Sequence, residues 1–384
     1  MSLRDIFPPP FYSDTRVEKF IYSNDASSYT GSCKAIVWPK TKDQLHKLIL
    51  YCRRTSHRLT IRGAATSTFG GTTPNDTIVV DMSKMNKILE INSTHVRVQA
   101  GLALSDLNLA LGKRIFPVQP LEHPACTIGG MIAMNALGLN TFYGPMSDWV
   151  EEMEVVDGTG KVMTLSPRNI QDFIGMEGST GIIISAKLKI LTRPIERTIS
   201  LYNFNTISAM MDRVNLLQRQ SKVLSIEYFD DRASKMMGLD SALHLIVEFN
   251  SQAGAIKESE EIKKIDEMKL KVQHEMVRRH FTRKEDPKLP TDQVAPFLHW
   301  LRKNQIPCFA HLHLNIVHPC FREPSHLVDE MYTVVEKVKG DKVGQYGVGI
   351  HRKGLLRRSK KENYLALKNK YDPKRLINRG VLID

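Results

Sequence analysis

The sequence is poor in cysteine and has no long apolar run. Its five cysteines include no Cys-x-x-Cys pair, so a disulfide framework, an iron–sulfur cluster or a zinc knuckle is poorly supported and a reducing compartment is expected. No apolar stretch approaches the ~18 residues of a membrane span. The first residues lack the apolar core of a signal peptide. We therefore expect a cytoplasmic protein, at most peripheral at the inner face of a membrane.

The length and composition indicate more than one globular domain. The chain has 384 residues, of which 42% are hydrophobic. That content is too high for a disordered chain, and the length is too great for a small disulfide-stapled scaffold. At the usual domain size there is room for roughly two to three domains.

The positive charge is concentrated near the C-terminus. The net charge is +13, and residues 351–380 hold 11 basic side chains against only Glu362 and Asp372. Such a segment can bind an anionic membrane surface, an acidic partner or nucleic acid, or it can be the solvated face of a helix. Its only aromatic residues are Tyr364 and Tyr371, and no nucleic-acid-binding motif accompanies it. We therefore predict no nucleic-acid partner and keep the membrane and the acidic partner as candidates.

Hydrophobic periodicity divides the chain into two halves. In the first, helix 41–55 with Thr41 as N-cap follows a short strand, and a hairpin over 149–165 turns at Asp157–Gly160. In the second, amphipathic helices at 208–220, 252–268 and 324–339 alternate with strands at 224–230, 242–249 and 309–317. The second pattern favours an antiparallel sheet with helices packed on one face.

Two segments of small residues could hold an anion. The first, Arg62–Ser67, directly follows a predicted strand, and the second spans residues 127–133. Small side chains let backbone N–H groups turn toward an anion, and the hydroxyls of Thr66 and Ser67 add donors. Neither segment matches the P-loop or the GxGxxG fingerprint, which disfavours ATP or NAD on a doubly wound sheet. Taken singly, each segment is commonly an ordinary turn.

Five motifs follow one another along the chain: RGAATS, TIGGMIAMNALG, FYG, EVVDGTGKV and EGSTGIII. In this order the chain resembles the flavoproteins with a vanillyl-alcohol-oxidase-type FAD-binding domain, most closely the D-lactate, glycolate and D-2-hydroxy-acid dehydrogenase branch. The likeness extends from Pro39 to the closing YDPKRLINRG. It implies an α+β fold with a two-subdomain FAD-binding domain (1–197), an antiparallel-sheet substrate or cap domain with helices on one face (198–340), and a C-terminal segment (341–384) returning to the first domain.

The resemblance also implies which residues contact the cofactor. The pyrophosphate of FAD would lie on a loop made by Arg62, Gly63, Ala64, Ala65, Thr66 and Ser67, and near Thr127, Gly129 and Gly130. The flavin or ribityl chain would lie beside Asn135 and Gly138, with Tyr143 and Gly144 close by. The adenine side would be flanked by Gly178, Gly181 and Ile182, and the final segment would return through Asn378. Some members attach FAD through a histidine where this chain has Thr66, so FAD is expected to be non-covalent.

Residues 311–317 alternate between polar and apolar side chains. As a strand they would place His311, His313 and Asn315 on one face. Two histidines two residues apart on a strand can bind one divalent metal, or line a polar pocket in which one acts as a base. They can equally lie on a wetted strand face.

The chain departs from the family pattern at this point. His313 matches the second of two histidines that usually flank a GDGN stretch, but GDGN is absent. Gln345 stands where a metal-binding Glu is usual, and Tyr346 where a His is usual. A neutral amide is a poor ligand for a hard cation, so the metal stays unassigned, with His311 and His313 as candidate ligands. Tyr346 could instead donate a hydrogen bond to the substrate, and His351 could supply the base.

Arg278 and Arg279 lie where the family places an arginine for the substrate carboxylate. A bidentate guanidinium–carboxylate pair would orient the α-C–H bond toward the flavin, which accepts the hydride. Alternatively, the two arginines belong to a basic turn whose charges face water.

These residues favour an FAD-dependent oxidoreductase that oxidises a small D-2-hydroxy acid of the lactate or glycolate type. Hydride would pass to FAD and the electrons to an external acceptor, such as a quinone or an iron–sulfur protein. One alternative is a flavoenzyme like alkylglycerone-phosphate synthase, although that enzyme's histidine-rich motif is missing here. Another is a non-catalytic flavin-binding subunit that docks through residues 351–380.

Overall fold

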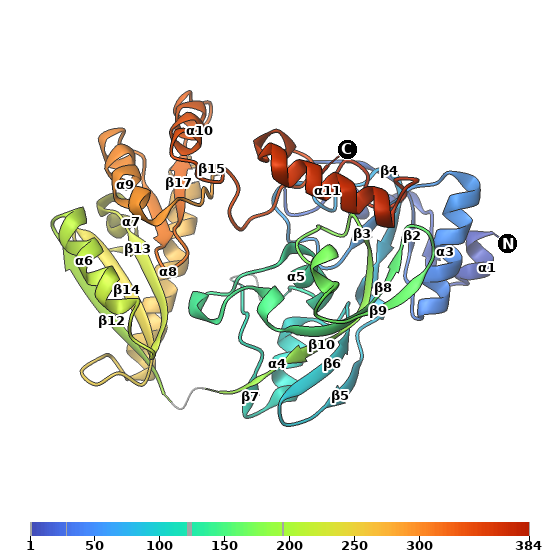
Figure 1. Cartoon of the computed structure of the whole chain (residues 1–384), viewed down its shortest axis with the longest axis horizontal. Helices are drawn as coiled ribbons and strands as arrows, with labels where there is room; N and C mark the ends of the chain where they lie inside the picture. The colour runs from blue at the N-terminus through green and yellow to red at the C-terminus, as the bar shows by residue number, and fades with distance from the viewer. Residues whose placement is uncertain (1, 28, 121–124, 194–195, 384) are drawn as a thin grey trace. The chain divides into compact units, whose positions relative to one another are not determined.

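The computed structural model of the protein describes residues 2–27, 29–120, 125–193 and 196–383 (Figure 1). The chain divides into two compact units. The first consists of Met1–Gly138, Gly144–Arg193 and Tyr346–Asp384, and the second of Leu139–Tyr143 and Pro194–Gln345. Within the described ranges, no helix has the length and apolar character needed to cross a membrane.

The first unit contains a four-stranded sheet in the order β1-β2-β4-β3. Its strands are β1 (Tyr12–Ser13), β2 (Ser32–Val37), β3 (Leu59–Arg62) and β4 (Asn75–Asp81); β2, β3 and β4 run parallel, and β1 is antiparallel to β2. Three helices accompany it: α1 (Leu3–Ile6), α2 (Arg16–Tyr22) and α3 (Lys42–Thr55). The predicted start of α3 is confirmed, because Thr41 and Gln44 form a capping box there.

A second sheet of this unit is antiparallel, in the order β5-β6-β10-β8-β9. Its strands are β5 (Ile88–Ile91), β6 (His95–Gln99), β8 (Val150–Asp157), β9 (Val162–Leu165) and β10 (Gly181–Lys189). The predicted hairpin is β8-β9, and its turn is closed by the Gly160 N–H bonded to the Asp157 carbonyl at 3.0 Å. The remaining elements are α4 (Leu104–Leu111), α5 (Ile128–Met134), α11 (Arg358–Tyr371) and the small pair β7 (Arg114–Ile115) with β11 (Leu191–Thr192).

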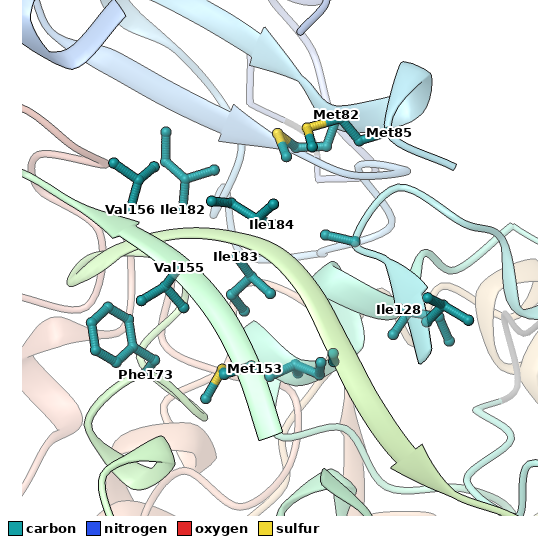
Figure 2. Packing of buried hydrophobic residues seen from close by; sticks show 14 of the residues in the cluster. Met82, Met85, Ile128, Met153, Val155, Val156, Phe173, Ile182, Ile183 and Ile184 are labelled. Atoms are coloured by element: carbon teal, nitrogen blue, oxygen red, sulfur yellow. The ribbon is translucent and has the colours of Figure 1, made fainter. Parts of the chain in front are cut away.

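The core of the first unit lies along β8 and β10. Val155 and Val156 of β8 and Ile182, Ile183 and Ile184 of β10 are all buried, and Figure 2 shows their side chains leaving both faces of the two strands. Strands that are buried on both faces read as continuous β-branched runs. This explains why the sequence of β10 shows no alternation.

The second unit is built on a six-stranded sheet in the order β12-β14-β13-β16-β17-β15, with every pair antiparallel. Its strands are β12 (Arg197–Phe204), β13 (Val223–Phe229), β14 (Leu243–Asn250), β15 (Arg283–Lys284), β16 (Cys308–His311) and β17 (Ile316–Phe321). Its helices are α6 (Ile207–Leu217), α7 (Asp231–Met237), α8 (Ser259–Arg278), α9 (Val294–Lys303) and α10 (Leu327–Lys337). Short 3-10 helices in the two units are η1 (Met82–Lys84), η2 (Thr141–Tyr143), η3 (Met146–Asp148), η4 (Ile170–Asp172), η5 (Thr291–Gln293) and η6 (Lys353–Leu355).

The predicted mixed fold with antiparallel sheets is confirmed, but helices cover both faces of the second unit's sheet instead of one. Ile199 of β12 packs in a cluster with α7 and α8. Tyr202, three residues along and therefore on the opposite face, accepts a 2.9 Å hydrogen bond from Arg213 of α6. The reason lies in β13, which is buried along its whole length and needs cover on both sides.

The predicted strand over 309–317 is wrong. β16 ends at His311, residues 312–315 form a tight turn, and β17 starts at Ile316, paired with His311. Asn315 occupies the left-handed region of that turn, with φ of 58°. A polar–apolar alternation of a few residues fits a hairpin as well as a strand, because period two does not show where the chain reverses. His311 and His313 therefore do not share a strand face.

Candidate functional site

The two small-residue segments lie against each other in the first unit. A Cβ atom built on Gly63 would overlap Oγ1 of Thr127. Nearby, the Thr66 hydroxyl lies 3.9 Å from the Cys126 sulfur. Only a glycine at residue 63 allows this approach, so two bends 64 positions apart in the sequence form one surface.

The first bend presents backbone donors. No hydrogen bond joins the N–H groups of residues 63–67 to any other group in the described part of the chain. Ala65 adopts φ of 56°, and a left-handed residue in a turn can direct successive N–H groups toward one point, where an anion can bind. The side chains of Thr66 and Ser67 are half-buried beside them.

The second bend serves to pack α5 closely. Thr127 caps the helix, and its Oγ1 accepts the N–H of Gly130 at 3.3 Å. A Cβ on Gly129 would lie 2.7 Å from the Cβ of Ala100, and the Gly129 N–H donates to the Ala100 carbonyl at 2.7 Å. These glycines therefore let the helix touch the segment that follows β6.

Asn378 connects the first bend to the segment around Gly178. Its Oδ1 accepts the N–H of Ile61 in β3 at 2.7 Å, and its Nδ2 donates to the Glu177 carbonyl at 2.8 Å. Gly178 has φ of 67°, and a Cβ there would lie 2.8 Å from Asn378 Nδ2. The side-chain amide of Asn378 thus joins the final segment of the chain to β3 and to the segment around Gly178.

The segment after Gly178 contains buried hydroxyls. Ser179 Oγ and Thr180 Oγ1 are fully buried and have no hydrogen-bond partner among the described residues. Gly181 starts β10, and a Cβ there would lie 2.7 Å from the Val156 carbonyl. The Ile182 side chain is in the apolar core (Figure 2), so only its backbone is available to a ligand.

The predicted flavin-side residues fall in both units. Asn135 ends α5 with φ of 48°, and its Oδ1 accepts the N–H of Ser147 at 2.9 Å. Gly138 lies against the backbone of Gln119, and Gly144 has φ of 76°. Tyr143 belongs to the second unit, where burial raises the pKa of its phenol.

Arg62 is already engaged by protein groups. Its Nη1 donates to the Asn24 carbonyl at 2.6 Å, and its guanidinium lies 5.1 Å from the ring centre of Tyr22. These contacts tie β3 to the end of α2. A contact from Arg62 to a phosphate remains a prediction.

The residues of the first unit fit FAD. The backbone N–H groups at 63–67, which have no partner among the described residues, and the hydroxyls of Thr66 and Ser67 supply donors for a pyrophosphate. The buried hydroxyls of Ser179 and Thr180 are further polar groups. Asn378 connects their segment to the first bend, because it bonds both Ile61 and Glu177. No charged carboxylate belongs to this donor set, which suits a dianionic ligand.

Tyr346 and His351 lie at the start of the first unit's last segment. The Tyr346 ring is half-buried and stacks on Phe69, with 6.4 Å between ring centres. His351 is exposed and stacks on Tyr29 at 3.4 Å, and partial burial lowers the pKa of its imidazole. Both rings are therefore oriented by aromatic neighbours.

His313 lies in the tight turn between β16 and β17. Its ring stacks on Phe142 at 3.6 Å, with 15° between the planes. Burial lowers the pKa of His313 below its ordinary value. The imidazole is consequently neutral near pH 7 and can accept a proton.

His311 lies beside a buried ion pair. It is opposite Glu227 in the ladder, and Glu227 binds Lys269 of α8 at 3.0 Å. Burial lowers the pKa of His311, and the charge of Glu227 opposes that change. Among the described residues, no group of three or more His, Cys, Asp or Glu side chains could hold a metal ion.

Arg278 and Arg279 end α8 with exposed side chains. Both donate to Glu275 Oε2, at 3.0 and 3.3 Å. This is the placement expected if their charges face water. Binding of a substrate carboxylate by them remains a prediction.

Comparison with protein-family models finds two matches in this chain. A model described as an FAD binding domain matches residues 33–166, and a model of the FAD linked oxidases, C-terminal domain, matches residues 309–382. The chain is therefore similar to the FAD-linked oxidases in these two segments. The family resemblance and the FAD cofactor expected from the sequence are thereby confirmed.

The chain is 29% identical to "Glycolate oxidase subunit GlcD" of Bacillus subtilis (strain 168) over 225 residues, which are 54% of this chain and 47% of that relative. The match thus spans about half the length of that protein. It is 24% identical to "D-2-hydroxyglutarate dehydrogenase" of Stutzerimonas stutzeri (strain A1501), with 90% of each chain covered. A solved structure of alkyldihydroxyacetonephosphate synthase matches with a TM-score of 0.71 at 15% identity, over 98% of this chain and 83% of that one, which shows a shared fold.

Sequence reasoning missed one buried acid of this chain. The carboxylate of Glu177 accepts the N–H groups of Val348 and Gly349 at 2.6 and 2.8 Å. Arg352, also missed, is buried with its guanidinium 4.3 Å from the ring centre of Phe69. One signal in the sequence could have indicated Glu177. It is an acidic residue directly before the glycine of EGSTG, a motif that leads into an apolar strand.

Proposed function

We propose that this chain oxidises a small D-2-hydroxy acid of the lactate or glycolate type with a non-covalently held FAD. The observation that carries the proposal is the contact of Gly63 with Thr127, which joins the anion-compatible first bend to the bend that starts α5 in one unit. The names of the relatives, a glycolate oxidase subunit and a D-2-hydroxyglutarate dehydrogenase, support the substrate class.

Non-covalent attachment follows from the residue at the first bend. Thr66 has a hydroxyl where a histidine would be needed for a link through an imidazole nitrogen. Retention of FAD then depends on hydrogen bonds and packing alone. Denaturation without proteolysis should release all of the flavin from the polypeptide.

The oxidation removes a hydride and a proton from the substrate. FAD, when bound, supplies the acceptor for the hydride of the α-carbon. We assign removal of the hydroxyl proton to His313, because partial burial lowers the pKa of its imidazole and so favours the neutral form that can accept a proton. Tyr346, oriented by Phe69, donates a hydrogen bond to the substrate. The two electrons leave to an external acceptor, such as a quinone or an iron–sulfur protein.

The substrate carboxylate requires a cation. Arg278 and Arg279 are the predicted partners, but both already bind Glu275. Substrate binding by these arginines therefore requires that the carboxylate of the substrate replaces the carboxylate of Glu275. Replacement of both by Gln should raise KM with little change of kcat, because the interaction is made equally in the ground state and the transition state.

The test is the visible spectrum of the purified protein before and after anaerobic addition of D-lactate, glycolate or D-2-hydroxyglutarate. Bleaching of the flavin band by one of them supports the proposal. A protein that holds flavin but is bleached by none of the acids is a flavin-binding subunit instead. A colourless protein that takes up no FAD refutes the cofactor assignment as well.

The base assignment has its own variant. His313→Gln should keep the flavin content and lose bleaching by at least about a hundredfold in rate, as expected for loss of a general base. His326→Gln, at an exposed position of the same unit, is the matched control. Bleaching at the wild-type rate in His313→Gln would remove His313 from the mechanism.

A further inference from the structure

The short helix α2 exposes its apolar face to solvent. Val17, Phe20 and Ile21 lie three and four residues apart, on one face of the helix, and their exposed fractions are 69%, 72% and 56%. A helix at the surface of a globular protein normally turns such a face toward the core. Contiguous apolar side chains in solvent mark an interaction surface.

The polar side of α2 is held against the first unit. Glu18 accepts hydrogen bonds from the hydroxyls of Ser13 and Thr15. Tyr22 donates to Asp81 Oδ2 at 2.5 Å and accepts from Trp38 Nε1 at 3.2 Å. These bonds fix the rotation of the helix about its axis. The apolar stripe of Val17, Phe20 and Ile21 is therefore held facing solvent.

Cations accompany the apolar stripe. Arg16 is exposed and Lys19 half-buried on the same helix. The chain after α2 folds back, with Asn24 bridged to Thr30 and the Gly31 N–H bonded to the Ser23 carbonyl at 2.8 Å. Arg16 precedes Phe20 by four residues, so its positive charge borders the stripe on the helix itself.

The fold-back connects α2 to the basic C-terminal segment. Tyr29 stacks on His351 with 3.4 Å between ring centres, and His351 opens the stretch that holds 11 basic side chains against two acidic ones. Four basic side chains at the start of α11 are exposed: Arg357, Arg358, Lys360 and Lys361. The first unit thus presents the apolar stripe of α2 and a segment rich in cations. The stack of Tyr29 on His351 connects the chain that follows α2 to that segment.

We propose that the apolar stripe of α2 and the basic segment 351–361 together bind an anionic lipid bilayer. Three apolar side chains on a two-turn helix suit the boundary between headgroups and acyl chains, which a short amphipathic helix enters in the plane of the interface. Clustered lysines and arginines are attracted to the negative surface potential of anionic lipids. The inference is independent of the proposed oxidation, because it requires neither FAD nor substrate.

This arrangement makes two requirements of the binding. The lipid must be anionic, because the stripe alone is too small to hold the protein on a zwitterionic surface. Binding must also weaken as salt rises, because the charges act through solvent over about one Debye length.

The test is co-sedimentation of the full-length protein with vesicles of phosphatidylcholine alone, or of phosphatidylcholine and phosphatidylglycerol in equal amounts. We expect binding to the mixed vesicles only, with release at high salt. The triple variant V17S/F20S/I21S should reduce the partition coefficient at least about tenfold. Leu109→Ser, at an apolar residue of α4 that is 84% exposed, is the matched control and should bind like the wild type.

The charge contribution is tested separately. Lys360→Glu with Lys361→Glu should reduce binding to the mixed vesicles, whereas Lys263→Glu with Lys264→Glu, the same reversal on exposed residues of α8, should not. Equal unfolding midpoints of all variants show that they are folded.

Three results would overturn the proposal. One is absence of binding to mixed vesicles at low salt, and another is undiminished binding by V17S/F20S/I21S. The third is a wild-type dimer in light scattering that the triple variant converts to a monomer, since a second copy would then cover the stripe.

Discussion

The backbone N–H of Val348 donates a 2.6 Å hydrogen bond to the carboxylate of Glu177, a residue 171 positions earlier in the chain. Gly349 donates to the other oxygen of the same carboxylate at 2.8 Å. Burial raises the pKa of Glu177, and the two N–H groups oppose that change. One side chain thereby anchors the turn after Tyr346 to the segment that contains Gly178.

Replacement of this acid by an amide tests the anchor. In Glu177→Gln a buried NH₂ group must face a backbone N–H, so two donors oppose each other. We expect the free energy of unfolding to fall by about 1–3 kcal/mol, measured by urea denaturation. Glu330→Gln, at an exposed position on α10, should change it little. Equal stability of both variants would show that the Val348 and Gly349 bonds contribute nothing net.

A methyl group at residue 63 tests the contact of the two bends. The added Cβ in Gly63→Ala would overlap Thr127 Oγ1, so the bends must move apart and FAD retention should fall. The ratio of flavin absorbance to protein absorbance after gel filtration measures it. Removal of Oγ1 in the double variant Gly63→Ala/Thr127→Ala should restore part of the flavin.

Gly354→Ala is the control for that series, because nothing lies within 4 Å of a Cβ at this position. It should retain flavin like the wild type. If Gly63→Ala also retains it fully, the contact does not position the cofactor loop.

The buried pair of Lys269 and Glu227 provides a stability test in the second unit. The negative charges of Glu227 and Glu248 raise the pKa of Lys269 although burial opposes them. Lys269→Met leaves the Glu227 carboxylate without its partner, which should cost about 3–5 kcal/mol of unfolding free energy. Lys264→Met on an exposed position of the same helix should cost little. A double variant with Glu227→Leu should recover much of the loss, because no charge then stays buried alone.

Two partly buried histidines, His311 and His313, predict a pH dependence of stability. Burial lowers the pKa of both His311 and His313, so below pH ~6.5 the unfolded chain binds more protons than the folded one. The free energy of unfolding should therefore fall as pH drops through this window. The charged groups that act on His311 are Glu227, Lys269 and Lys284, and of these only Glu227 acts against the change; the ring of His318 also faces it edge-on, with 5.2 Å between ring centres.

The variant His313→Gln should flatten the slope of unfolding free energy against pH below pH ~6.5 by up to one proton. Urea denaturation at a series of pH values measures the slope. His326→Gln, at an exposed position, should leave it unchanged. An unaltered slope in His313→Gln would mean that His313 titrates alike in both states.

Where local signals were strong, the sequence predicted the structure. The capping box of Thr41 and Gln44 and the turn at Asp157–Gly160 depend on neighbours within four residues, so their geometry is written in short segments of sequence. The hairpin at His311–Ile316 carried no such signal. Its reversal at Asn315 uses a left-handed residue that is not a glycine, and the pairing of β16 with β17 selects it.

The sequence by itself determined the order of the motifs, the family resemblance with its FAD cofactor, and the excess of positive charge in residues 351–380, because each of these is a property of residues taken in chain order. Only the tertiary structure decided that Gly63 touches Thr127, that Asn378 joins Ile61 to Glu177, and that α2 turns its apolar side outward. Each of these depends on which surfaces the packed units leave available. Packing between distant segments is a property of the whole chain, and no local pattern encodes it.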